Sequence, residues 1–167
     1  PKGYKLVGMD ASGLELRMLA SYMNDKDYTN QILDGDIHTY NQNMAGLETR
    51  DQAKTMIYAL CYGAGDAKMG EIINGSASAG KKLKTTLFDN IPSLANLITK
   101  VKKASNRGYL KGLDGRKIKV KSEHSAPNYL LQSAGAIVMK KALVLLYEDA
   151  KKENLDFKLI GNIHDEI

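Results

Sequence analysis

The chain has 167 residues, 43% hydrophobic and 26% charged, a composition that excludes a disordered segment and allows one sizeable core. Lysine and arginine outnumber aspartate and glutamate by 24 to 19, and the resulting charge of +5 is compatible with a nucleic-acid partner but does not require one. Cys61 is the only cysteine, which excludes an internal disulfide and a cysteine-based zinc site and indicates a reducing, intracellular setting.

The first predicted elements are a strand and the helix that follows it. Tyr4 to Met9 is an apolar, strand-like run close to the start of the chain. Ser12 with Glu15 three residues later fits a capping box, which predicts a helix from this point through about Tyr22.

The middle of the chain is predicted to be helical. Thr49 with Gln52 repeats the capping-box pattern and begins a helix at Arg50, which the Gly63-Ala64-Gly65 cluster ends. Further helices are expected over about 66–73, 77–88 and 93–106, the last one beginning just after Pro92.

A β-hairpin is predicted next. The runs 109–113 and 116–121 flank Asp114-Gly115, the dipeptide that best accepts the positive φ angles of a two-residue turn. The hairpin carries Arg116 and four lysines, a density of positive charge that suits a duplex backbone. A solvated strand edge that lysines protect from aggregation explains the same charges equally well.

The last predicted elements are a long helix and a strand. Ser125 and Pro127 begin the helix, which runs to about Lys152 with an apolar face that should pack on the sheet. Residues 157–163 form the final strand-like run. The order strand, helices, hairpin, helix, strand predicts an α+β fold in which helices are inserted between the elements of an antiparallel sheet.

The most informative stretch is the predicted helix that begins at Arg50. Arg50, Lys54, Tyr58 and Tyr62 follow one another at intervals of four, so on a helix they form one slowly winding stripe. Two cations suit phosphate oxygens, and two phenol rings offer flat faces and hydroxyl groups to a sugar and a base. The stripe is the right shape for a nucleoside triphosphate, although each residue alone is equally typical of a solvated or half-buried helix face.

Acidic residues stand at the ends of the two outer strands. Asp10 follows the first predicted strand, and Asp165 with Glu166 follows the last one. If the two strands are neighbours, these carboxylates supply hard oxygen ligands for a pair of Mg²⁺ ions, the arrangement used in phosphoryl transfer. A capping aspartate and a solvated acidic turn are the alternative explanation, because spacing in the sequence alone does not bring them together.

Taken together, these segments resemble family A DNA polymerases, and most closely those of T7-like bacteriophages. Three segments are similar to the motifs that the family calls A, B and C: residues 10–17, 50–63 and 164–166. Three linking segments also resemble the phage branch: 35–39 (GDIHT), 112–117 (GLDGRK) and 131–136 (LQSAGA). The resemblance extends over essentially the whole chain.

The resemblance implies a palm sheet interrupted by a helical fingers subdomain. Residues 1–40 would be the first part of the palm, 41–107 the fingers, and 108–167 the second part of the palm with a truncated motif C. The family's thumb and the strand after motif C are absent from this stretch. We therefore expect a piece of a longer polymerase that is weakly active or inactive by itself.

The resemblance also implies roles for particular residues. Two Mg²⁺ ions would be bound by Asp10, the Ala11 carbonyl and Asp165, with Glu166 beside them. Arg50 would grip the outer phosphates, and Lys54 the α-phosphate side with proton donation to pyrophosphate.

Other residues would contact the nucleotide or the DNA. The nucleotide-binding set would be Glu15, His38, Arg50, Lys54, Tyr58 and Tyr62, with Glu15 blocking a ribose 2′-hydroxyl. The DNA-binding set would be Gly63, Arg116, His124, Asn128, Gln132 and His164. From the residues alone, His38 is typical of a structural histidine near a helix start, the capping box already explains Glu15, and the amides of Asn128 and Gln132 suit acceptors in the minor groove.

Tyr58 carries a more specific implication. In this family a tyrosine at the sugar-facing position goes with acceptance of dideoxynucleotides, and phenylalanine goes with their rejection. We therefore expect the parent enzyme to incorporate dideoxynucleotides readily.

The expected partners are primer-template DNA, dNTPs and a processivity factor bound through the thumb, in the cytoplasm of an infected bacterial host. No membrane partner is expected, because no apolar run approaches the roughly 20 residues of a membrane span and no signal peptide is evident. Two alternatives stay open: a single-subunit phage-type RNA polymerase, against which Glu15 argues, and a catalytically silent module that binds nucleic acid.

Overall fold

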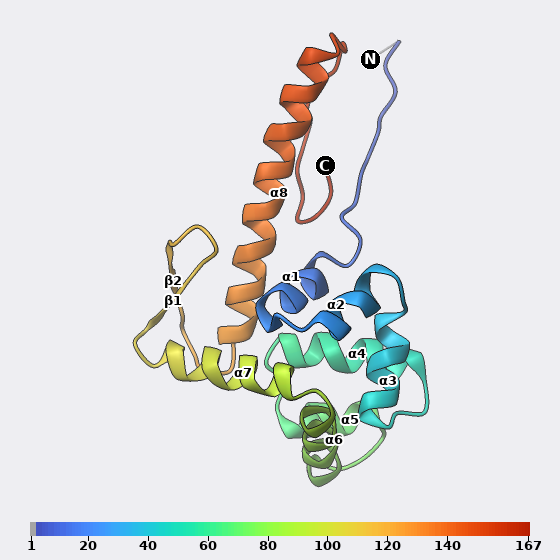
Figure 1. Ribbon diagram of the computed structural model, residues 1–167, viewed down its shortest axis with the longest axis vertical. Coiled ribbons are helices and arrows are strands. Elements are labelled where there is room, and N and C mark those ends of the chain that lie inside the picture. The colour runs from blue at the N-terminus through green and yellow to red at the C-terminus, as the bar shows by residue number, and fades with distance from the viewer. Residues whose placement is uncertain (1–2) are drawn as a thin grey trace.

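The computed structural model describes residues 3–167 and shows a body of short helices from which one long helix projects (Figure 1). The body contains α1 (Leu14–Met23), α2 (Lys26–Leu33), α3 (Ile37–Ala45), α4 (Arg50–Cys61), α5 (Asp66–Ile72), α6 (Ala77–Asn90) and α7 (Pro92–Ser105). An antiparallel hairpin, β1 (Tyr109–Lys111) and β2 (Lys117–Lys119), precedes the projecting helix, α8 (Ala126–Lys152). Helices with a small antiparallel sheet agree with the predicted α+β class.

One hydrophobic core joins the seven helices of the body. Leu19 of α1 and Tyr28 of α2 belong to the same buried cluster as Met56 and Ile57 of α4 and Leu87 of α6. The cluster therefore crosses position 40, where the palm was expected to give way to the fingers. The subdomain boundaries stay a prediction, and the first two residues of the region 1–40 lie outside the described part of the chain.

The two predicted capping boxes have different outcomes. At the start of α4, the Thr49 hydroxyl accepts from the backbone nitrogen of Gln52. The side-chain oxygen of Gln52 accepts in return from the backbone nitrogen of Thr49, so this box is confirmed. At α1 the prediction is wrong: the N-cap residue is Gly13, at a left-handed φ of 62°, and no side chain caps the helix. Since Ser12 lies one position too early, its hydroxyl is not placed to accept from the first helical turn.

The hairpin is present, but its turn differs from the predicted one. The Gly115 nitrogen donates to the Gly112 oxygen at 3.0 Å, so Leu113 and Asp114 are the central residues of the turn. Gly115 follows at a φ of +83°, whereas Asp114 does not have a positive φ. The loop is thus a turn closed by one left-handed glycine, and the glycine is required after the turn and not inside it.

The two outer strands were predicted wrongly. Residues 4–9 and 157–162 are extended without regular strand pairing in the described chain. Pairing is limited to isolated bridges, one between Asp10 and Glu166 and one between Ile163 and Glu166. A strand needs a hydrogen-bonded neighbour along its length, and among the described residues the two runs are joined by side chains at Tyr4 and by main-chain pairing only where 9–11 meet 165–167.

The long helix α8 is buried in its first half and exposed in its second. Leu131, Ala134 and Met139 are buried, and Leu131 belongs to the core of the body, whereas Val144 and Leu145 are 47% and 45% exposed. Contrary to the sequence-based expectation, α8 is long and apolar enough to cross a membrane by length and composition, with a mean hydropathy of 1.4 over 18 residues, of which 28% are buried. Core helices of soluble proteins meet the same criterion, so the absence of a membrane partner stays a prediction.

Candidate functional site

The structure brings the two distant acidic positions together. The Ala11 nitrogen donates to the Asp165 oxygen at 2.9 Å, and Met9 and Ile167 exchange two hydrogen bonds of 2.9 Å. This main-chain pairing puts Asp10 opposite Glu166 and Ala11 opposite Asp165, so the two acidic segments are neighbours, which the sequence offered only as a condition. The side chain of Glu166 packs against Gly8, whose missing Cβ leaves room for the carboxylate.

The donor set at this point fits a hard divalent cation. Mg²⁺ is usually held by one or two carboxylates together with substrate phosphates, so Asp10 and Asp165 are a sufficient protein contribution. The Ala11 oxygen accepts one hydrogen bond, from the Leu14 nitrogen at 3.2 Å, and a carbonyl has a second lone pair for a metal. Within residues 3–167, no group of three or more His, Cys, Asp or Glu side chains forms a cage by itself.

A cavity of about 580 Å³ lies beside the paired segments, with Asp165 but not Asp10 in its lining. Its lining comes from α1, from the end of α4, from the first half of α8 and from the chain end: Leu14, Glu15, Tyr62, Asn128, Leu131, Gln132, Gly135, Ala136, His164 and Asp165. The Gln132 amide joins two walls of this cavity, because it lies 3.3 Å from both the Glu15 carboxylate and the Tyr62 hydroxyl. The residues predicted to block a ribose 2′-hydroxyl, to bind the nucleotide and to contact DNA therefore line the same cavity.

Negative charge concentrates in the cavity. Burial raises the pKa of Glu15, the hydrogen bond from Gln132 opposes that rise, and the nearby Asp165 carboxylate adds to it. The Glu15 carboxylate in turn raises the pKa of the Tyr62 hydroxyl, which is the largest influence on that group. A cavity with this potential favours a cation over a free anion.

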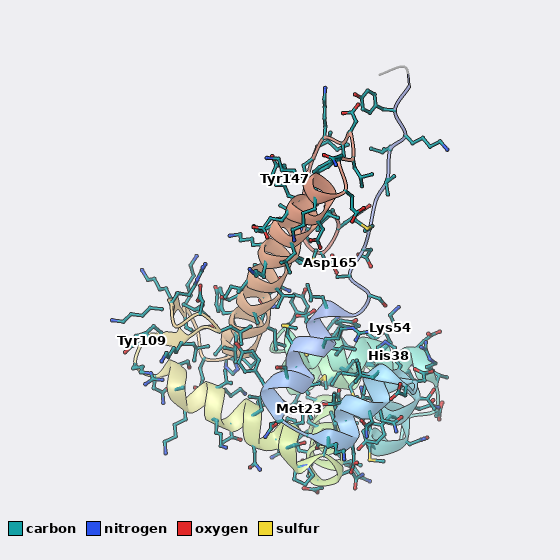
Figure 2. All side chains as sticks on the ribbon, turned by 45° about the horizontal axis from the view of Figure 1, so that its top comes forward. Met23, His38, Lys54, Tyr109, Tyr147 and Asp165 are labelled. Atoms are coloured by element: carbon teal, nitrogen blue, oxygen red, sulfur yellow. The ribbon has the colours of Figure 1, made fainter. Side chains whose placement is uncertain are left out.

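The cationic half of the α4 stripe lies at the start of the helix. The Arg50 guanidinium binds the Asp36 carboxylate through Nε at 2.6 Å and Nη2 at 3.1 Å. Lys54, one turn further on, is exposed. Figure 2 shows Lys54 and His38 in the helical body, with Asp165 beside α8.

His38 and Tyr58 form the middle of the same surface. Their ring centroids are 6.1 Å apart, which places the imidazole of α3 beside the phenol of α4. Burial lowers the pKa of His38, with Arg50 and Lys54 lowering it further and Asp36 opposing them. Burial is also the main cause that raises the pKa of Tyr58. Near neutral pH both rings are therefore uncharged, and each keeps a proton to donate.

A close backbone contact fixes the end of α4 against the turn before α8. Gly63 has a φ of +80°, and a Cβ built there would lie 2.0 Å from the His124 oxygen. Only glycine satisfies both the left-handed backbone and this approach. Gly63 thus has a structural role whether or not it also contacts DNA.

The remaining residues predicted to bind DNA lie in different settings. The Arg116 guanidinium is held by its neighbour Asp114 at 2.6 Å, whereas His124 is exposed. The Asn128 Nδ2 is buried and, among the described residues, has no hydrogen-bond partner. His164 has a left-handed φ of 56° and lines the cavity. The structure therefore brings Asn128, Gln132 and His164 to one cavity and leaves Arg116 on the hairpin.

Sequence reasoning missed Asp36 and Asp114, the acidic partners of the two arginines. Asp114 was interpreted only as a turn residue, and Asp36 only as part of a motif. The sequence did carry a signal for Asp36, because aspartate is a preferred helix N-cap and Asp36 stands two residues before His38, close to a helix start.

The site defines a class of protein. In this class two paired chain segments carry acidic residues, and they lie beside the end of a helix that carries cations and then phenols at one-turn intervals. The chain belongs to DNA polymerase family A, whose family model matches residues 1–167. This finding confirms the resemblance drawn from the motifs.

Individual relatives agree with this assignment. The chain is 42% identical to the DNA-directed DNA polymerase of Enterobacteria phage T3 and 41% identical to that of Escherichia phage T7, over 99% of this chain in both cases. It is 30% identical to DNA polymerase I of Aquifex aeolicus, again over 99% of its length. The chain spans 27% of the length of the two phage enzymes.

A solved structure shares the fold. The POL domain of Pol1 from M. smegmatis, in complex with DNA primer-template and dNTP, superposes with a TM-score of 0.88 over 99% of this chain and 33% of that chain. The sequence identity is 22%, so this likeness establishes the fold alone.

Proposed function

We propose that the chain is the catalytic part of a template-directed DNA polymerase, which joins a dNTP to a primer 3′-hydroxyl. One observation supports this most strongly: main-chain pairing joins the segment of Asp10 to that of Asp165, next to the cavity that Asp165 and Tyr62, at the end of α4, both line. The similarity to the T3 and T7 enzymes favours phage replication, in the cytoplasm of an infected bacterium, as the setting. A processivity factor bound through a thumb also belongs to this proposal.

The residues would divide the reaction among them. Asp10, Asp165 and the Ala11 carbonyl would hold two Mg²⁺ ions, which when bound lower the pKa of the primer hydroxyl and neutralise the leaving pyrophosphate. Arg50 would bind the outer phosphates, and Lys54 would contact the α-phosphate side and give a proton to pyrophosphate.

The remaining contacts orient the nucleotide and the DNA. His38 would donate to a phosphate from its neutral ring, and Tyr58 would lie against the sugar. Tyr62 and Gly63 would lie beside the nascent base pair, while Asn128, Gln132 and His164 would contact the primer-template. Glu166 would remain next to the acidic pair, and His124 and Arg116 would contact the duplex nearby.

The full-length protein that carries this chain tests the proposal. Asp165→Asn removes one charge without removing the main-chain pairing, so primer extension should fall at least about 100-fold. Asp149→Asn is the matched control, because its carboxylate forms an exposed pair with Lys152 on α8, away from the cavity. Unchanged extension by the Asp165 variant would show that the acids are not catalytic and would favour a silent nucleic-acid-binding module.

The choice between DNA and RNA synthesis depends on Glu15. Gln132 donates to the Glu15 carboxylate in the wall of the cavity, and in this proposal the carboxylate would meet a ribose 2′-hydroxyl there. We therefore expect the full-length protein to prefer dNTPs and Glu15→Ala to incorporate rNTPs more readily. Equal use of dNTPs and rNTPs by the unmodified protein would instead favour the phage-type RNA polymerase.

A further inference from the structure

Asp36 makes more contacts than a helix cap requires. Its carboxylate accepts from the nitrogens of His38 and Thr39 at 3.0 and 3.4 Å and from the Thr39 hydroxyl at 2.9 Å. The same carboxylate also holds Arg50, fourteen residues away, through two further hydrogen bonds. One anchored anion thus links the start of α3 to the first residue of α4.

The Asp36 contacts leave part of Arg50 free. A guanidinium has five N–H donors, and Asp36 uses only those on the edge formed by Nε and Nη2. The three other donors, including both on Nη1, have no hydrogen-bond acceptor among the described residues. Arg50 is therefore fixed in direction and can still bind a second anion.

The direction in which Arg50 is fixed follows from the packing of α3 and α4. Asp36 precedes His38 on the same helix, and the His38 ring lies beside Tyr58 of α4. The Arg50 guanidinium beside Asp36 holds the pKa of that carboxyl well below its usual range, so the pair stays ionised at all working pH values. The ion pair with Asp36 consequently keeps Arg50 in one arrangement with His38 and Tyr58.

We infer that Asp36 is a positioning residue that aims the free edge of Arg50 at the outer phosphates of the incoming nucleotide; this inference rests on the proposed function. The alternative role, a stabilising ion pair, contributes little because the two side chains are 49% and 44% exposed and solvent screens them. The effect of Asp36 should therefore be found in nucleotide binding and not in folding.

Asp36→Asn in the full-length protein separates positioning from capping. The amide oxygen still accepts from the nitrogens of α3, but the charge and one of the acceptors for Arg50 are lost. Steady-state primer extension should give a KM for dNTP that is about 10-fold higher, with kcat little changed. Asp36→Glu restores the charge and should recover part of the KM. Asp34→Asn, an exposed aspartate two residues away, is the matched control and should leave both constants unchanged.

A double-substitution cycle with Arg50→Lys tests whether Asp36 acts through Arg50. Lysine keeps the charge but lacks the planar edge, so adding Asp36→Asn to it should change the KM no further. An equal increase in both backgrounds would overturn the inference. So would an unchanged or lower KM for Asp36→Asn alone, the lower value meaning that Asp36 competes with the triphosphate. Absence of extension by the unmodified protein would instead reject the proposed function.

Discussion

Tyr58 is a half-buried phenol among charged neighbours. Burial first, and then Glu15, Cys61 and Asp165, raise its pKa, so the hydroxyl remains protonated at working pH. The sequence placed Tyr58 on the stripe by its spacing alone, and that placement is confirmed by α4. The nearness of the His38 ring could not be predicted, because it depends on how α3 packs against α4.

Tyr58→Phe tests what the hydroxyl does for the sugar. In the full-length protein, termination by dideoxynucleotides should fall at least about 10-fold, because only the phenol can replace the missing 3′-hydroxyl as a polar neighbour. Gel analysis of terminated primers measures this ratio. Tyr40→Phe, which removes a hydroxyl in the body of α3, is the control, and equal termination by Tyr58→Phe and the unmodified protein would contradict the expectation.

Cys61 is predicted to be inert in the folded chain. Burial raises the pKa of its thiol to about 12 from an ordinary value of 9.0, and the side chain is 1% exposed. Alkylation by iodoacetamide at pH 8 should therefore be at least about 100-fold slower in buffer than in denaturant. Equal rates in the two conditions would show that the end of α4 opens readily.

The same thiol makes stability depend on alkaline pH. The unfolded thiol ionises near pH 9 and the folded one near pH 12, so the free energy of unfolding should fall as pH rises between these values. By pH 10 the loss from Cys61 should be on the order of 1 kcal/mol. Denaturant unfolding at pH 8 and 10 should show a smaller decrease for Cys61→Ala than for the unmodified chain. An identical decrease in both would contradict the predicted pKa.

At the scale of elements, some local signals in the sequence predicted the structure correctly and others did not. Thr49 and Gln52 predicted the start of α4 because both capping contacts are local. The outer strands could not be predicted correctly, because an extended run becomes a strand only through a neighbour that local sequence does not specify. The end of α4 was predicted only in part. Gly63 was recognised as ending the helix, but its contact with His124 joins distant segments and could not be predicted.

Gly63→Ala should destabilise the chain by about 2–4 kcal/mol, since it adds both a left-handed backbone penalty and a steric overlap with the His124 oxygen. Chemical denaturation measures the loss. Gly46→Ala is a close control, because Gly46 has a φ of +66° but no atom near the added Cβ. The control should lose only about 1–2 kcal/mol. Equal losses would mean that the His124 contact is unimportant.

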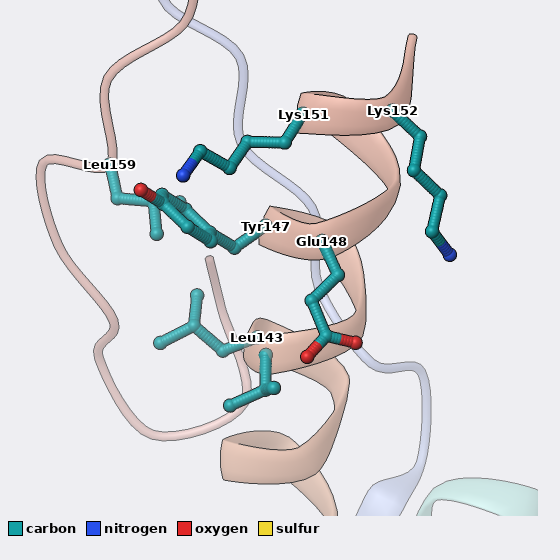
Figure 3. Close-up of a pocket in the computed structure, with 7 residues that line it drawn as sticks. Leu143, Tyr147, Glu148, Lys151, Lys152 and Leu159 are labelled. Atoms are coloured by element: carbon teal, nitrogen blue, oxygen red, sulfur yellow. The ribbon is translucent and has the colours of Figure 1, made fainter.

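At the scale of the whole molecule, the exposed apolar surface gathers away from the body. It includes the start of the chain, the second half of α8 and the segment after it, where Leu6, Val7, Leu155, Ile160 and Ile163 are 60–82% exposed. A hollow of about 550 Å³ lies in this region. Figure 3 shows Leu143, Tyr147 and Leu159 among the residues that line it. Apolar surface of this extent is unusual for a free monomer and is typical of a surface that associates.

The chain expressed by itself should therefore self-associate at micromolar concentration. Replacing Leu6 and Ile160 together by lysine puts charge into the apolar surface and should return the chain toward a monomer in sedimentation experiments. Leu33→Lys is the control, because Leu33 is 60% exposed on α2 in the body. Equal effects of the control and the double variant would show that net charge, and not this surface, governs association.

The pairing of residues 9–11 with 165–167 also sets an order of events as the chain folds. Asp10 and Asp165 are 155 positions apart in the sequence, so joining their segments closes a long loop, and contacts of this kind form after local helices. On the ribosome, Asp165 emerges when the helical body has already been synthesised. A nascent chain thus holds helix α4 before the segments of Asp10 and Asp165 are paired.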